Sequence, residues 1–409
     1  MSPDMDDIGP FRVSQWLQPM GVGIGYHKET FEEVFIKTER MASTLDHEAT
    51  ILQTLSGGIG IPTLYWFGKA YNQKTMITDA LGPSLEEIFD RSNRYFDMPL
   101  VLEVASQLIF RLEWMHSHHI AHGQLSPFSF AMGASTWQTP QVILADFTNV
   151  NSSQFSTKKD LQAVADILVY LAIGPPSWDL FQARKPSLAE IPSPLKGFVS
   201  IISDREMNPA DYIILRRYFH TARQSLPGRT ILGGLGSPQG EKLSLKSLAS
   251  KSTGDLFENL GSKISTVGDS AGDPKAPWGR EQAKFLLGSL NEIMTIYFVL
   301  LMREKPSQKR RHYHMGVYHL PNRLWRDLRW YLCMAKCGSL PLQRLIVLTI
   351  YKYVGVLLEV IPVYNRYWTK ILSDAAYEQM KLDEDCWRMW RDAWMYWKNC
   401  ANLLTKKDM

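Results

Sequence analysis

The chain opens with a strand-like pattern and continues with a helical one. Runs such as 33–37 and 75–78 alternate apolar and polar residues, which is typical of β-strands. From Leu100 onward the apolar positions recur with the period of an α-helix. Over 101–116 the residues on one face are Val101, Ala105, Leu108, Leu112 and Met115. Strands followed by helices predict an α+β, two-lobed unit with a small β-rich lobe before a helical lobe.

The pattern divides the rest of the chain at two points. Residues 225–278 are rich in glycine, serine and lysine, a composition typical of a flexible linker. Past Trp278 the sequence is again apolar and aromatic, with helical periodicity as far as Leu404. We therefore expect an α+β domain over 1–224, a linker over 225–278 and a separate all-α region over 279–409.

Two long apolar stretches, Phe285–Met302 and Leu342–Ile361, bear on whether the chain spans a membrane. Polar or charged residues interrupt both, so buried helices explain the stretches better than membrane spans. The interrupting residues are Asn291, Glu292, Arg344, Lys352 and Glu359. We expect no membrane span, and the residues near Met1 lack the pattern of a secretory signal.

The composition is that of an ordinary globular protein, since 45% of the 409 residues are hydrophobic and 21% are charged. The formal net charge of +4 is small for this length and gives no reason to expect nucleic acid as a partner. The four cysteines lie in the last quarter and do not indicate a disulfide framework. An intracellular location, cytoplasmic or nuclear or both, is expected.

Two short motifs in the predicted domain are specific enough to compare with known families. Residues 55–62 have the sequence LSGGIGIP, and residues 81–89 have the sequence LGPSLEEIF. They resemble the casein kinase I family rather than protein kinases in general. The similarity continues through Phe130–Gly133, Lys159–Asp160 and Asn208–Tyr212 and covers roughly the first 225 residues. It implies a two-lobed protein-kinase fold.

The resemblance also implies a site for ATP. Lys37 stands where the family has the strand lysine that holds the nucleotide phosphates, and Glu48 stands where a helix glutamate pairs with that lysine. The alternative is a surface lysine and an unrelated helix glutamate. Thr78 falls at the gatekeeper position, and Asp79–Leu81 correspond to the hinge that faces the adenine ring.

The glycine-rich loop of the family is poorly preserved. Gly21, Gly23 and Gly25 alternate along the chain but lack the G-x-G-x-x-G spacing. Two interpretations stay open. The glycines either bind phosphate or form a tight hairpin turn that uses the conformational freedom of glycine.

The catalytic loop departs furthest from the family. Its H-R-D-x-K-P-x-N run aligns with residues 122–129, where His122 and Pro127 are kept. The arginine, the base aspartate, the phosphate-binding lysine and the metal-binding asparagine are replaced, in that order, by Gly123, Gln124, Ser126 and Ser129. A general base alone contributes roughly 10²- to 10⁴-fold in rate. We therefore expect no catalytic residue in this loop.

Ala145–Thr148 takes the place of the family's D-F-G motif. Asp146 is the candidate for binding magnesium on nucleotide phosphates, while Thr148 in place of glycine restricts the backbone. The activation segment that normally follows is largely missing before Asp160, which removes the platform for a protein substrate. Asp160 is expected to be structural rather than catalytic, with its carboxylate capping backbone amides at a helix start.

These changes predict a pseudokinase, a non-catalytic scaffold or regulator for which binding of ATP and magnesium is optional. The alternative is an unconventional active serine/threonine protein kinase that uses Lys37 and Asp146 to hold magnesium–ATP. In a third interpretation the C-terminal region is the functional domain and the kinase-like domain is its platform.

The last predicted helix carries Trp387, Trp390, Trp394 and Trp397 at spacings of three, four and three, so the four rings share one face. Core packing is the favoured interpretation, and a surface that binds a partner is the alternative. We expect a protein partner to bind through this C-terminal helical region.

Two smaller features also leave alternatives open. The basic cluster Lys309–His314 is interpreted as a solvated loop rather than a site for a phosphorylated partner, RNA or an import receptor. Cys333 and Cys337, with three histidines upstream, are interpreted as a buried thiol pair rather than a zinc site.

Overall fold

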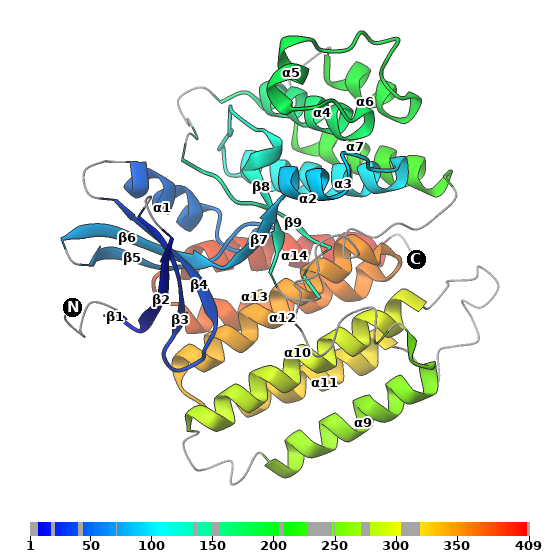
Figure 1. Cartoon of the computed structure of the whole chain (residues 1–409). Helices are drawn as coiled ribbons and strands as arrows, with labels where there is room; N and C mark the ends of the chain where they lie inside the picture. The colour runs from blue at the N-terminus through cyan, green and yellow to red at the C-terminus, as the bar shows by residue number, and fades with distance from the viewer. Residues whose placement is uncertain are drawn as a thin grey trace. The chain divides into compact units, whose positions relative to one another are not determined.

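The structure of the chain is a computed structural model. It describes residues 7–17, 21–39, 44–70, 72–134, 137–138, 140–148, 150, 155–203, 208–226, 248, 250–270, 279–303 and 320–406. Contacts divide the chain into two units, one formed by residues 1–38 together with 238–409 and the other by residues 39–237. An N-terminal β-rich part precedes a mostly helical remainder (Figure 1), which confirms the predicted α+β class.

The strands of the first unit pair antiparallel in the order β1-β2-β3-β4. Their bounds are β1 (Asp7–Ile8), β2 (Phe11–Leu17), β3 (Val22–His27) and β4 (Glu33–Glu39). Side chains alternate between the two faces of a strand, and Phe11 and Val13 of β2 are accordingly buried while their neighbours are exposed. A bulge between Val13 and Gln15 shifts the register of β2 against β3.

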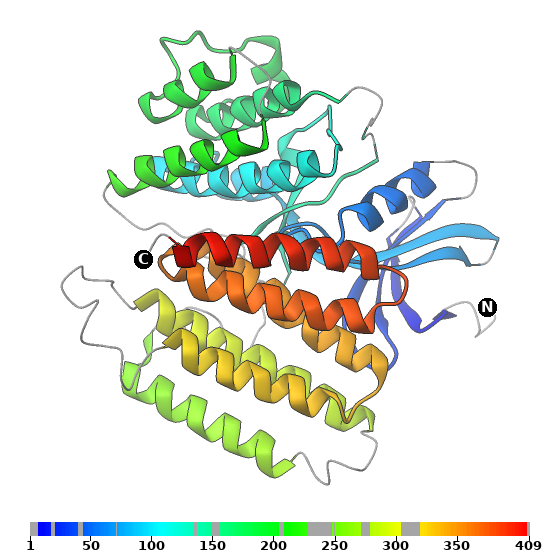
Figure 2. The same cartoon turned by 180° about the vertical axis from the view of Figure 1, so that it is seen from behind.

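The other elements of the first unit are helical. They are α9 (Thr253–Ser270), α10 (Arg280–Arg303), α11 (Leu320–Ala335), α12 (Leu340–Val360), the 3₁₀ turn η5 (Pro362–Tyr364), α13 (Asn365–Leu382) and α14 (Trp387–Lys406). Helices α12, α13 and α14 lie side by side in both views (Figure 1, Figure 2). Ser339 caps α12, because its hydroxyl accepts a hydrogen bond from the Leu342 amide at 3.5 Å.

Two of these helices are long and apolar enough to cross a membrane, judged over the part of the chain that the structure describes. They are Glu281–Arg303 and Leu340–Val360. In the fold, 67% and 72% of their most apolar windows are buried inside the protein. Buried core helices pass the same test of length and composition, and the burial agrees with the expectation of core helices.

The turn between β3 and β4 contacts two helices of the first unit. The ammonium of Lys284 on α10 lies 5.5 Å from the ring centroid of Phe31. The Ser339 hydroxyl donates to the carboxylate of Glu29 at 2.9 Å. Residues 1–38 therefore group with the C-terminal helices, whereas the sequence-based division assigns them to a domain that ends at residue 224.

Helix α9 lies inside the segment expected to be a flexible linker, so that prediction is wrong over residues 253–270. Leu256, Leu260 and Val267 of α9 are buried, and their spacing places them on one face of the helix. Helix α9 packs with α10 (Figure 1). The many glycines around these residues concealed the helical period in the sequence.

The strands of the second unit include a hairpin and a small sheet. Strand β5 (Leu64–Ala70) pairs antiparallel with β6 (Gln73–Asp79). Strands β7 (Leu81–Ser84), β8 (Phe130–Gly133) and β9 (Val142–Leu144) form an antiparallel sheet in the order β7-β8-β9.

Helix α3 is the centre of the second unit's core. It begins after Asp97, whose carboxylate accepts a hydrogen bond from the Leu100 amide at 3.0 Å. All five residues predicted to share its inner face are 0% exposed, which confirms that prediction. Helix α3 packs against α4 and α7.

The helical elements of this unit are α1 (Thr44–Thr54), α2 (Leu85–Arg91), α3 (Met98–Ser117), the 3₁₀ turn η1 (Pro127–Ser129), α4 (Thr157–Ile173), α5 (Trp178–Ala183), α6 (Ser193–Ser203) and α7 (Pro209–Gln224).

The LSGGIGIP motif packs against α3. A Cβ added at Gly58 would lie 2.4 Å from the ring of Trp114, and one added at Gly60 would lie 2.0 Å from the guanidinium of Arg111. The guanidinium of Arg111 is fully buried and donates to the Val142 carbonyl at 2.9 and 2.6 Å. The two glycines are thus required for close packing rather than for chemistry.

Candidate functional site

The predicted catalytic loop follows α3 and is held by one buried carboxylate. Asp160, in the first turn of α4, is 0% exposed. It accepts hydrogen bonds from the backbone amides of His122 and Gly123, each at 2.7 Å. His116 Nε2 donates to the same carboxylate at 2.9 Å, and the other ring nitrogen of His116 bonds the Tyr212 hydroxyl. The loop backbone is therefore fixed from inside the core.

These bonds agree with the interpretation of Asp160 as structural, and they change its detail. The amides that its carboxylate holds belong to the loop at 122–123 and not to the start of its own helix. Helix α4 is capped by Ser156, whose hydroxyl accepts a hydrogen bond from the Lys159 amide at 3.3 Å. The sequence could place Asp160 at a helix start but could not show which distant amides it meets.

Gly123 and Gln124 occupy the turn of the loop. Gly123 has φ +80°, a left-handed conformation that costs other L-residues roughly 1–2 kcal/mol. Gln124, which the sequence comparison predicts to replace a catalytic base, is exposed. Its backbone amide donates to His122 Nδ1 at 3.4 Å. The side chain of Gln124 is a neutral amide, which cannot accept a proton at neutral pH.

His122 connects the loop to the segment that contains Asp146. Its ring is 1% exposed, and Nε2 donates to the Asp146 carbonyl at 2.7 Å. With Nδ1 accepting from the Gln124 amide, both ring nitrogens are used by backbone groups. His122 is thus a structural link between the two segments rather than a proton carrier.

Ser126 and Ser129 bond each other across the turn η1. The Ser126 amide donates to the Ser129 hydroxyl at 3.1 Å, and the two hydroxyl oxygens lie 3.4 Å apart. Ser129 is 2% exposed, and its carbonyl accepts from the amides of Ala145 and Asp146 at 2.8 and 3.3 Å. The Ser129 hydroxyl, predicted from the resemblance to replace a metal ligand, is therefore engaged within the loop.

Asp146 is half-buried, and its Oδ1 accepts a hydrogen bond from the Thr148 amide at 3.0 Å. Among the described residues there is no group of three or more histidine, cysteine or acidic side chains that could hold a metal ion. A magnesium ion at Asp146 would therefore depend on nucleotide phosphates and water for most of its ligands. The residues present fit magnesium poorly, because the second protein ligand of the family is replaced by the engaged Ser129.

Helix α1 is tied to the segment after Asp146 by a contact that the sequence did not predict. His47 Nε2 donates to the carbonyl of Val150 at 2.6 Å, and Val150 is 3% exposed. The next residue on α1 is Glu48, which is 4% exposed. On the other side, Asp46 forms an ion pair with Lys74 of β6. The segment after Asp146 thus fixes the orientation of the helix that carries Glu48.

The hinge residues are placed by backbone pairing and by one side chain. Thr78 and Asp79 end β6 and are 7% and 9% exposed, and Leu81 begins β7 and is half-buried. The Asp79 carboxylate accepts a hydrogen bond from the Thr63 amide at 2.7 Å. Its charge therefore serves the local fold.

The glycines before Lys37 are explained by the hairpin. Gly21 has φ +64°, and its carbonyl accepts from the Thr38 amide at 2.6 Å. A Cβ at Gly23 would lie 2.9 Å from the Gln15 carbonyl, and one at Gly25 would lie 2.4 Å from the Arg12 carbonyl. These requirements favour the hairpin interpretation over phosphate binding.

Lys37 lies on β4, opposite Val22 of β3. It belongs to the first unit, while Glu48, Thr78, Asp79, Leu81 and Asp146 belong to the second. The ion pair between Lys37 and Glu48 stays a prediction from the sequence. What the structure does bring together is the set 116, 122–124, 146 and 160 in the second unit.

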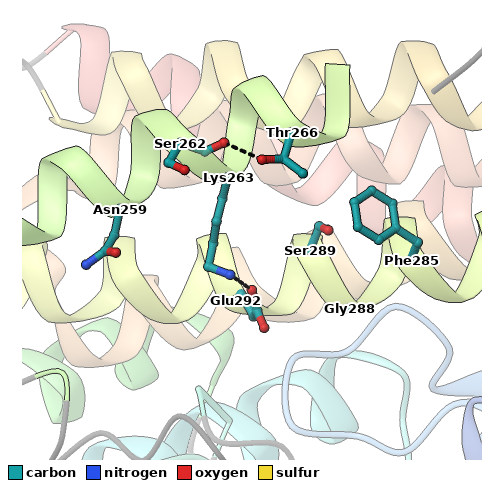
Figure 3. A pocket seen from close by; sticks show the side chains of 8 residues that line it. All are labelled: Asn259, Ser262, Lys263, Thr266, Phe285, Gly288, Ser289 and Glu292. Atoms are coloured by element: carbon teal, nitrogen blue, oxygen red, sulfur yellow. Dashed lines mark hydrogen bonds and ion pairs between the residues drawn. The ribbon is translucent and has the colours of Figure 1, made fainter. Parts of the chain in front are cut away.

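A groove of about 460 Å³ lies elsewhere, between α9 and α10 of the first unit. Figure 3 shows Lys263 of α9 crossing it to an ion pair with Glu292 of α10. The other lining residues are Asn259, Ser262, Thr266, Phe285, Gly288 and Ser289. The two charges neutralise each other, and none of the predicted nucleotide-site residues lines the groove.

The remaining C-terminal predictions have mixed outcomes. Cys333 is exposed and Cys337 is half-buried, so the prediction of a buried thiol pair is wrong for Cys333. The basic cluster Lys309–His314 and the upstream histidines lie outside the described residues. The tryptophans of α14 are divided, since Trp390 and Trp397 are buried while Trp387 is exposed.

No protein-family model matches the chain. The likeness to casein kinase I accordingly rests on the motifs of the sequence.

Proposed function

We propose that this chain is a casein kinase I-like pseudokinase, a scaffold or regulator without phosphoryl-transfer activity. The observation that carries the proposal is the bonding of residues 122–129. A buried carboxylate holds the loop backbone, yet the positions where a kinase requires a base, a cation and a metal ligand carry Gln124, Ser126 and Ser129. The loop keeps what it needs to fold and lacks what it needs to transfer phosphate.

The expected loss of rate is large. Phosphoryl transfer is catalysed mainly by positioning and by electrostatic stabilisation of the transferring group. Removal of a general base costs roughly 10²- to 10⁴-fold, and removal of one electrostatic stabiliser costs roughly 10²- to 10³-fold. Gln124 in place of the aspartate removes the general base, and Ser126 in place of the lysine removes one electrostatic stabiliser. The shortened segment before Asp160 adds the loss of a platform for protein substrates.

Binding of ATP and magnesium is optional in this proposal. Asp146 supports it, because the residue is half-buried and its carboxylate accepts only one observed hydrogen bond among the described residues, from the Thr148 amide. Lys37 and Glu48 remain candidates through their positions in the sequence. A protein partner is proposed to bind through the C-terminal helices.

The decisive experiment measures transfer of labelled phosphate from ATP by the purified full chain, to casein and to itself. We expect no transfer above the level of a Lys37→Met variant. Transfer by the wild-type chain that Lys37→Met abolishes would overturn the proposal. Gln124→Asp serves as a matched variant, and we expect it to stay inactive because Ser126 and Ser129 still lack the charge and the metal ligand.

The alternative function is that of an unconventional serine/threonine kinase in which Lys37 and Asp146 hold magnesium–ATP. The half-buried Asp146 carboxylate is the observation that favours it. Thermal-shift measurements with ATP, with and without magnesium, report nucleotide binding separately from phosphate transfer. A magnesium-dependent shift that Asp146→Asn removes would assign the metal to Asp146, while the transfer assay decides whether chemistry follows.

A further inference from the structure

Helix α14 has a buried side and an exposed side, and both carry tryptophans. On the buried side, Trp397 Nε1 donates to the Tyr351 hydroxyl of α12 at 2.7 Å. The ring of Trp390 meets the ring of Tyr351 edge to face at 5.2 Å between centroids. These two rings are 4% or less exposed and belong to the core.

The exposed side, here called the α14 face, has a different composition. Its residues lie within a sector of about 120° on a helix of 3.6 residues per turn. They are Trp387, Arg388, Arg391, Trp394, Met395 and Lys398. Trp387 and Met395 are 41% and 42% exposed, so the face displays apolar surface among its cations.

The cations of the α14 face lie over its aromatic rings. The guanidinium carbons of Arg388 and Arg391 are 5.4 and 5.7 Å from the ring centroid of Trp387. The ammonium of Lys398 is 4.7 Å from the ring centroid of Trp394. Cation–π contacts of this kind hold long side chains in place at the surface.

Helix α13 continues the same arrangement beside α14. The ring of Tyr377 lies 5.2 Å from the ring of Trp394, and the ammonium of Lys381 is 4.1 Å from the centroid of Tyr377. Two of the cations here also have acidic partners, since Arg391 pairs with Asp392 at 3.2 Å and Lys381 pairs with Glu378 at 2.9 Å. The surface therefore combines aromatic rings with Arg388 and Lys398, whose observed contacts among the described residues are those rings.

We propose that the α14 face is a docking surface for an acidic segment of a protein partner that carries apolar anchor residues. The proposal deepens the scaffold function proposed above and rests on it. Charge complementarity favours an acidic partner, because Arg388 and Lys398 lie on the face without an observed ion pair among the described residues, whereas Arg391 pairs with Asp392. Tryptophan, methionine and arginine are enriched in protein interfaces, and tryptophan and arginine at their hot spots.

The geometry argues against a nucleic acid on this surface. Single-stranded nucleic acids stack their bases on free aromatic faces. Here cations of the same chain lie over the rings of Trp387, Trp394 and Tyr377. A lipid surface is also disfavoured, because a helix that binds in the membrane interface presents a continuous apolar side.

The test measures binding of the full chain to a short peptide that is rich in glutamate and carries leucine anchors, by fluorescence anisotropy without ATP. We expect binding that weakens with rising salt and that Arg388→Glu with Arg391→Glu weakens about tenfold or more. Trp387→Ala should weaken it about as much. Phosphate transfer in the separate kinase assay would overturn the pseudokinase proposal and leave this binding result unaffected.

Matched variants keep the result specific. Arg217→Glu with Lys336→Glu makes the same charge change at exposed positions away from α14, and Leu403→Ala removes an apolar side chain that is 62% exposed on α14 but outside the α14 face. Both should bind like the wild type. Equal weakening by these controls, absence of binding, or tighter binding to a single-stranded oligonucleotide or to phosphatidylserine vesicles would overturn the proposal.

Discussion

The loop around Asp160 and the α14 face both gather polar groups, and they differ in what those groups contact. At Asp160 the carboxylate is fully buried and each observed bond goes to the protein's own backbone or to a core histidine. On the α14 face the charges are exposed and contact rings at the surface, and Arg391 also pairs with the exposed Asp392. The comparison indicates that the polar groups around Asp160 maintain the fold, while those of the α14 face are exposed on a C-terminal helix.

The largest expected loss of stability comes from the buried side of α14, in contrast to its exposed side. Trp397→Ala removes a buried ring and its hydrogen bond to Tyr351, so it should destabilise the first unit by about 3–5 kcal/mol. Trp387→Ala removes an exposed ring and should cost less than about 1 kcal/mol. Differential scanning calorimetry of the full chain measures both. Equal losses would show that the two sides of α14 do not differ as described.

Asp160→Ala should destabilise the second unit by roughly 3 kcal/mol or more, because two buried backbone amides and His116 lose their acceptor. Asp166→Ala is the control on the same helix. Its ion pair with Lys185, at 2.6 Å, is near the surface and should be worth less than about 1 kcal/mol. Thermal unfolding followed by circular dichroism is the measurement, and a small effect at Asp160 would contradict its role as the anchor of the loop.

Glu113 on α3 is an intermediate case, a mostly buried carboxylate whose partner reaches the surface. Burial raises its pKa to about 6, although Arg216 of α7 lies 2.8 Å away and acts in the opposite direction. The folded state thus holds the proton more tightly than the unfolded state. The stability that this provides is present below a pH of about 4.5 and is lost as the pH rises through about 6.

Glu113→Gln removes this titration. The stability of the variant relative to the wild type should therefore rise by roughly 2 kcal/mol between pH 4.5 and pH 7, because the wild-type pKa is raised from 4.5 to about 6. Urea unfolding at a series of pH values measures the difference. A difference that does not change with pH would contradict the raised pKa.

His47 is expected to give the smallest effect, since it contributes one hydrogen bond. His47→Ala should cost about 1 kcal/mol and should increase hydrogen exchange in α1 more than elsewhere in the second unit. His47→Gln keeps a donor and should restore part of the protection. Unchanged exchange in α1 of the alanine variant would show that the Val150 carbonyl does not fix this helix.

The sequence predicted the features whose cause is local. The helical period of 101–116 and the strands at 33–37 and 75–78 depend on neighbouring residues, and the helix and both strands are confirmed, although residues 75–78 are all buried rather than alternating. The substituted loop residues could be found for the same reason. The glycines of LSGGIGIP were noticed as a motif, but their packing against Trp114 and Arg111 requires the fold.

Contacts between distant residues account for what the sequence missed. His47 and Val150 are 103 positions apart, and no periodic pattern connects them. Helix α9 was taken for a linker because glycine lowers helix propensity, whereas burial of Leu256, Leu260 and Val267 outweighs that preference. The tryptophans of α14 share a face in sequence, but only the neighbouring helices decide which of them are covered.

The first unit is discontinuous, and this has a consequence for synthesis on the ribosome. Residues 1–38 are made first, but the rest of their unit begins at residue 238. At about 5–20 residues per second, the N-terminal strands wait roughly 10–40 s before the first of those residues is made. During that time β1–β4 lack the helices that Phe31 and Glu29 contact in the finished protein. If the N-terminal half were expressed alone, β1–β4 would never meet these helices.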